Sequence, residues 1–150
     1  MFTDFFRRLT APAPGPLPNP DARLALAALL VRAAKADDLY QVAEIARIDR
    51  ILARRYGLNP VEAAQLRARA EAAEHEAPDT VRFTRAVKDA VPHEERMAVA
   101  EALWSVVLAD GQRGDTKTAF LRMVAPLLGL TDPDSALARQ RAEAGLGRPS

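Results

Sequence analysis

Two aspartates follow apolar runs at the same spacing, and they are the first residues whose chemistry the sequence suggests. Asp37 lies seven residues after Leu30, and Asp110 lies seven residues after Leu103. Seven residues are about two helical turns, so each carboxylate is expected on the inward-facing side of its helix, like its leucine. A carboxylate at the negative end of a helix, partly out of water, needs a hydrogen-bond donor or a cation. Two alternatives follow: each Asp caps the backbone N–H groups of the next turn, or the two share a metal ion.

The two aspartates belong to an internal repeat. Residues 30–58 align with residues 103–130 after a one-residue gap. Each copy reads as an apolar helix, an Asp at its end, a short polar turn, and a second apolar helix that finishes in Gly-Leu. We expect the copies to form two helix pairs packed about a pseudo-twofold axis.

The elements that must position these turns are helices. The chain is 49% hydrophobic and 27% charged, and it is rich in Ala, Leu, Arg and Glu. This composition favours α-helix and is typical of a globular domain. The prediction is an all-α fold, a compact bundle of about seven helices built from two pseudo-repeated helix pairs. The helices are expected at about residues 21–37, 42–57, 60–75, 80–91, 92–110, 120–128 and 133–144, with N-caps at Asp21 and Asn59.

A Pro-rich stretch separates the first residues from this bundle. Proline alternates with other residues from Pro12 to Pro20, a pattern that excludes a regular helix and favours an extended linker. The predicted organisation has three parts: an amphipathic N-terminal segment with its linker (residues 1–20), the helical domain (21–145) and a tail (146–150).

The N-terminal segment carries phenylalanines at helical spacing followed by arginines, namely Phe2, Phe5, Phe6, Arg7 and Arg8. It could fold back onto the domain, dock onto a protein partner, or make a peripheral membrane contact. So short a segment binds a bilayer weakly, which favours protein over lipid.

Composition excludes several classes of function. The chain has no Cys and two His, so disulfides, thiolate metal sites and His-rich zinc centres are excluded. The net charge of +1 lacks the strong positive field of most nucleic-acid-binding proteins. No apolar run approaches the roughly 20 residues that cross a bilayer, and we expect a cytoplasmic protein. No Gly-rich phosphate loop and no nucleophile motif occurs, so the prediction is not an enzyme.

Positive charge concentrates on the second and third predicted helices, at Arg47, Arg50, Arg54, Arg55, Arg67 and Arg69. Acidic residues are interleaved with them at helical spacing, namely Glu44, Asp49, Glu62 and Glu71. The expected role is a solvent-exposed helix face on which these arginines and acids form ion pairs. The alternative is a contact surface for an acidic partner or phosphate.

Five motifs in order, LAALLVRAAKAD, RRYGL, VRFTRAV, LWSVVLADG and LLGL, resemble the TerB-like tellurite-resistance family over residues 24–130. The resemblance implies a compact helical domain of the cytoplasm, linked to tellurite and stress responses and without enzymatic activity. It also implies that acidic turns hold a divalent cation such as calcium. No other cofactor is implied.

The family pattern, Ala-Asp-Gly with a Glu seven positions after the Asp, assigns candidate metal ligands. Asp37 and Glu44 match it in the first turn, and Asp110 and Asp115 fit the second, but Lys117 stands at the second Glu position. An ammonium group opposes cation binding by like charge. Lys117 could instead pair with Asp37 or Glu44 and replace the cation. The alternative function is then a metal-free adaptor that contacts a protein partner through the Phe-rich N-terminus and the Arg-rich helix face.

Overall fold

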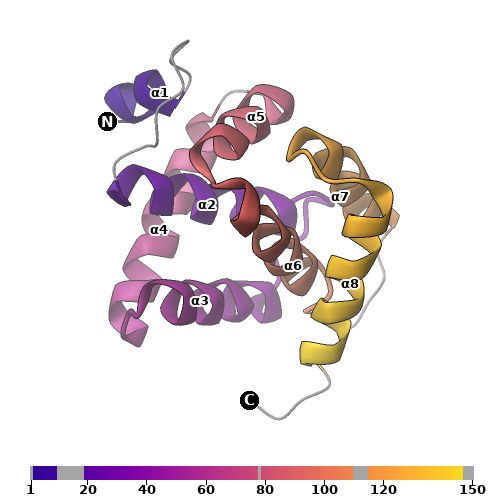
Figure 1. Ribbon diagram of the computed structural model, residues 1–150. Coiled ribbons are helices and arrows are strands. Elements are labelled where there is room, and N and C mark those ends of the chain that lie inside the picture. Colours follow the sequence, from indigo (N-terminus) through magenta and orange to yellow (C-terminus); the bar gives the residue numbers. More distant parts are fainter. Residues whose placement is uncertain (1, 10–18, 78, 110–114, 147–150) are drawn as a thin grey trace.

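The computed structural model describes residues 2–9, 19–77, 79–109 and 115–146, and within them every regular element is helical, which confirms the all-α prediction (Figure 1). The helices are α1 (Thr3–Leu9), α2 (Asn19–Ala34), α3 (Val42–Tyr56), α4 (Pro60–Glu76), α5 (Thr80–Ala90), α6 (Arg96–Val107), α7 (Asp115–Leu127) and α8 (Asp132–Leu146), with a short 3-10 turn at His93–Glu95 before α6. The helix not counted in the predicted bundle is α1.

Helix α2 lies at the centre of the bundle and is enclosed on all sides. Every residue from Leu24 to Val31 is buried, as are Ala33 and Ala34. A helix that is apolar around its whole circumference must be covered by other elements, and α2 contacts α1, α3, α4, α5, α6 and α7. The alanines between the leucines are therefore core residues as well as the leucines.

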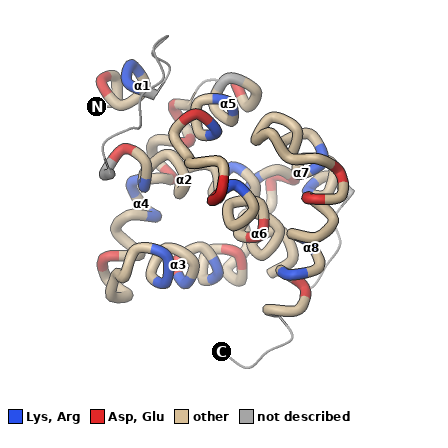
Figure 2. Tube along the Cα trace, in the orientation of Figure 1, with Lys and Arg blue, Asp and Glu red and all other residues tan. Residues whose placement is uncertain are grey.

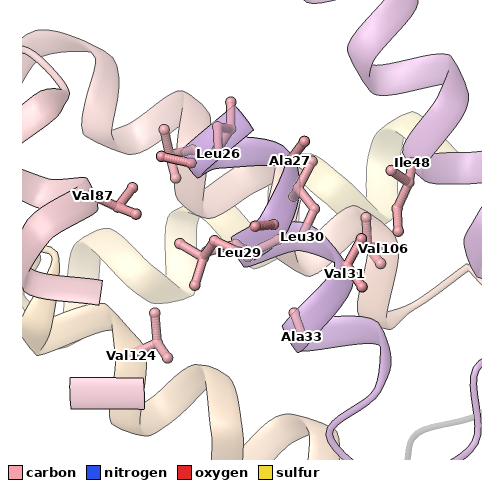
Figure 3. Close-up of a cluster of buried hydrophobic side chains, with 14 of the residues drawn as sticks. Leu26, Ala27, Leu29, Leu30, Val31, Ala33, Ile48, Val87, Val106 and Val124 are labelled. Atoms are coloured by element: carbon pink, nitrogen blue, oxygen red, sulfur yellow. The ribbon is translucent and has the colours of Figure 1, made fainter. Parts of the chain in front are cut away.

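Side chains from the surrounding helices meet α2 in one hydrophobic core (Figure 3). Ile48 of α3, Val87 of α5, Val106 of α6 and Val124 of α7 are all at most 1% exposed. Burying an aliphatic side chain of this size stabilises the fold by about 1.5–3 kcal/mol. Four helices, three of them distant from α2 in sequence, are thus held against one central element.

Helix α4 packs closely on α2 through small residues. Ala63, Ala70 and Ala73 are fully buried, and their small side chains allow the α4 backbone to lie near α2. The Asn59 cap is confirmed: the Glu62 N–H donates to Asn59 Oδ1 at 2.8 Å.

The predicted helix pairs, α2 with α3 and α6 with α7, end in the same backbone geometry. Gly57 has φ of 64° and Gly129 has φ of 81°, both in the left-handed region. The Leu58 N–H donates to the Ala53 carbonyl at 2.9 Å, and the Leu130 N–H donates to Ala125 at 3.0 Å. Glycine permits these caps because it has no Cβ to clash at positive φ.

The N-terminal segment folds back onto the domain. Helix α1 contacts α2 and α5, and its Phe2 and Phe5 side chains are buried. Arg8 forms an ion pair with Asp21 in the first turn of α2, with Nη2 to Oδ1 at 3.0 Å. Asp21 is therefore not the N-cap that we expected, since α2 begins at Asn19 and the carboxylate is used by Arg8. The Pro-rich linker lies mostly outside the described residues, and the predicted domain boundaries stay a prediction.

Replacing Phe5 by Ala should release α1, because a buried Phe anchors this short helix, and a Phe-to-Ala change in a core costs about 3–5 kcal/mol. In amide hydrogen exchange, protection of α1 should be lost while that of α2–α8 is retained. Asp4→Ala is the control, since the Asp4 side chain is exposed. An α1 that stays protected in Phe5→Ala would contradict the anchoring role.

Candidate functional site

A lysine is buried where the two helix pairs meet. The Lys117 side chain on α7 is 2% exposed, and its ammonium lies against the Glu44 carboxylate of α3, which is fully buried. Lys117 Nζ donates a hydrogen bond to Glu44 Oε2 and lies 3.6 Å from Asp37 Oδ1. The positive charge is thus neutralised by carboxylates from the first helix pair, which confirms the pairing that we predicted for Lys117.

Glu44 is held in place by the start of its own helix. It lies in the first turn of α3, where its other oxygen, Oε1, accepts from the Gln41 N–H at 2.9 Å. A carboxylate at this position satisfies an N–H that the helix leaves free, and the helix dipole favours its charge. Each Glu44 oxygen therefore has a donor, as a buried carboxylate requires.

Asp37 caps the turn that joins α2 to α3. Its Oδ1 accepts from the Leu39 N–H at 3.0 Å, and Asp38 between them has φ of 62°. This hydrogen bond is the capping role that the sequence suggested. Helix α2 ends at Ala34, so Asp37 lies in the turn rather than on the helix, and its side chain is 22% exposed.

Glu44 and Lys117 occupy the same place in the two predicted repeat copies, seven residues after Asp37 and Asp110 respectively. The structure brings these two positions into contact across the molecule. Two carboxylates facing one another here would repel and require a cation, whereas one carboxylate and one ammonium neutralise each other.

The two other predicted ligands are not placed. Asp110 lies outside the described residues, and Asp115 begins α7 but its side chain also lies outside them. Among the residues that the structure does describe, no group of three or more His, Cys, Asp or Glu side chains forms a cluster able to hold a metal ion. A hard divalent cation takes six or more oxygen ligands. Asp37, Glu44 and Lys117 offer two carboxylates and an opposing positive charge, so this part of the donor set does not fit such a cation.

The ion pairs expected along the arginine-rich face form only in part. Arg67 of α4 bridges to Asp49 of α3 at 2.6 Å and to Glu71 at 3.2 Å, as predicted. Glu44 instead pairs with Lys117, and the Glu62 carboxylate accepts from the Asn59 N–H at 3.0 Å. In these two acids, carboxylate oxygens accept from the backbone N–H groups at helix starts and, in Glu44, from the buried lysine.

Comparison with known proteins agrees with this architecture. A family model described as "Tellurite resistance protein TerB" matches residues 23–140. The chain belongs to the TerB family. No curated protein and no solved structure matched. The TerB match confirms the resemblance seen in the sequence and extends it past residue 130 into α8, so the contact between α6 and α8 lies within the family domain. Within the described segments, no helix is both long and apolar enough to cross a membrane.

Lys117→Met should destabilise the protein by about 3–5 kcal/mol, because it leaves the Glu44 charge buried without its cation. Adding Glu44→Gln should recover part of this loss, since the double variant buries no charge at this point. Chemical denaturation of the four proteins in this mutant cycle measures the coupling free energy.

The control for this cycle is Arg7→Met, which breaks the exposed ion pair with Asp4, whose side chains are 75% and 76% exposed. That change should cost almost nothing. If Lys117→Met is no more destabilising than Arg7→Met, the buried pair is not what holds the helix pairs together.

Proposed function

We propose that this chain is a non-enzymatic, metal-independent TerB-family module that acts in the stress response by contacting a protein partner. The observation that carries the proposal is the burial of Lys117 between Glu44 and Asp37. In this protein the ammonium group supplies the positive charge that the family pattern assigns to a divalent cation.

The buried ion pair has a consequence for how the module works. Because the lysine is covalently part of α7, the two helix pairs are held together at any concentration of divalent cations. The surface that the bundle presents is then constant, as an adaptor requires. A metal-regulated member of the family would instead change its stability with cation binding.

The same burial supports a binding role rather than a catalytic one. Glu44 is fully buried and its oxygens are used by Lys117 and the Gln41 N–H. A general acid or base must reach the proton that it transfers, and neither Glu44 nor Lys117 reaches the surface.

Thermal melts of chelator-stripped protein test metal independence. For the natural chain we expect the same melting temperature with and without millimolar calcium, magnesium, manganese or zinc. Lys117→Glu should be less stable without metal, because it adds a third carboxylate, and a divalent cation should restore several degrees. An ion at about 100 times its dissociation constant adds roughly 2.7 kcal/mol.

Arg122→Glu, on the exposed side of α7, is the matched charge-reversal control and should not respond to cations. The opposite result is a natural chain that calcium or another cation stabilises, with the effect abolished in Asp37→Ala/Asp110→Ala. That result would replace this proposal by a metal-sensing site.

The link to the stress response rests on the family description alone. We expect a strain lacking this chain to grow more slowly on tellurite, and the natural chain to restore growth while Lys117→Met, being unstable, restores it less. Equal growth of the deleted and parental strains would remove tellurite from the proposed role.

A further inference from the structure

A groove of about 340 Å³ lies between α3, α6 and the C-terminal part of α8. Its apolar surface comes from short side chains and one isoleucine, namely Ile51, Ala98, Ala102 and Ala142. These residues form a shallow hydrophobic floor. The volume of the groove lies at the lower end of the range of small-ligand sites, about 300–1,000 Å³, so the groove has room for a short segment of a ligand.

Arginines surround this floor, and we call the site the arginine groove: Arg47, Arg50, Arg54 and Arg55 of α3 and Arg141 of α8. The first three follow one face of α3, where Figure 2 shows basic positions along the helix. At 1.5 Å per residue they form a row about 10 Å long. Arg141 approaches from the other side of the groove, so its part in the site could not be seen from the spacing on α3.

The positive charge of the arginine groove is not neutralised within the described part of the chain. There, Arg47, Arg50, Arg54 and Arg141 make no hydrogen bond and no ion pair, and Arg55 alone reaches a carboxylate, Glu95 at 3.4 Å. Burial, together with the neighbouring charges of Arg50 and Arg54, lowers the pKa of Arg47. Arg67, on the adjacent face of α4, is by contrast bound by two carboxylates. The groove thus holds like charges close together, and a bound anion would reduce the repulsion between them.

We propose that the arginine groove binds an acidic peptide segment of a partner protein, with carboxylates on the guanidinium groups and an apolar side chain on the floor. Guanidinium groups pair with carboxylates through two parallel hydrogen bonds, which a row of Lys would not do. The inference rests on the proposed function, since it names the class of partner that the module contacts.

The observations favour a peptide over other polyanions. A row of about 10 Å is short beside the phosphate backbone that a duplex presents, and specific nucleic-acid sites are larger. Acidic side chains also stand close by: Glu101 lines the groove and Glu95 pairs with Arg55. They limit how many anionic groups the groove can hold, which suits a short peptide with a few carboxylates better than a long polyanion. The site is concave, whereas a bilayer surface is flat.

The test is fluorescence anisotropy of the full chain with a labelled short peptide of Glu and Asp around one Leu. A peptide with Gln and Asn in place of the acids is the uncharged counterpart. We expect only the acidic peptide to bind, with an affinity that falls as salt rises. Arg50→Glu/Arg54→Glu should weaken binding at least about tenfold, because it replaces two charge-assisted contacts by repulsion.

A matched control is Arg69→Glu/Arg85→Glu, which makes the same change in net charge at exposed sites outside the groove. It should change the affinity less than about threefold. All four substituted arginines are exposed, and melts check that each variant keeps its fold.

Three outcomes would overturn the assignment: no binding of the acidic peptide, an equal loss in the control variant, or tighter binding of single-stranded DNA or phosphatidylserine vesicles that depends on Arg50 and Arg54. Failure here is distinguishable from failure of the proposed function. The melts with divalent cations depend on Asp37 and Lys117, and substitutions in the groove leave that result unchanged.

Discussion

An apolar helix cannot be left in water on any side, and the fold of this TerB-family chain is built around that constraint. Helix α2 buries its leucines and also the alanines between them, so other helices must enclose it completely. Alanines on α4 allow one neighbour to approach closely, while valines and an isoleucine on α3, α5, α6 and α7 fill the remaining space. Phe2 and Phe5 of α1 complete this cover, so the N-terminal segment contributes to the core.

The buried lysine compensates the negative charge that the same architecture places inside the protein. Asp37 lies in the turn after α2, and Glu44 is buried in the first turn of α3. Two carboxylates therefore lie close together at the place where α7 packs on the first helix pair. A buried carboxylate without a partner is costly. Lys117 brings the compensating charge from the second helix pair. The contact that neutralises the site is therefore also one of the contacts that join the first helix pair to the second, beside the packing of α2 on α6 and α7.

The distribution of charge separates positions that stabilise the fold from positions available for binding. Lys117 and Arg67 are both neutralised by carboxylates of other helices. Glu74 likewise forms ion pairs with Arg32 at 3.2 Å and with Lys35 at 2.9 Å. In the arginine groove this pattern weakens: among its arginines in the described part of the chain, Arg55 alone reaches a carboxylate, that of Glu95, although Glu101 also lines the groove. Charges that a protein leaves uncompensated beside a hydrophobic floor are those that a partner can use.

The sequence by itself determined the helical class, most helix positions, the Asn59 cap, the glycine ends at Gly57 and Gly129, and the family. These follow from propensity, periodicity and local hydrogen bonds, which act over a few residues. It also suggested that Lys117 could replace a cation. Only the tertiary structure decided which carboxylate Lys117 meets, that α1 docks on the core, and that Arg141 joins the arginines of α3. Such pairings depend on which helix faces touch, and local spacing carries no information about contacts between residues distant in sequence.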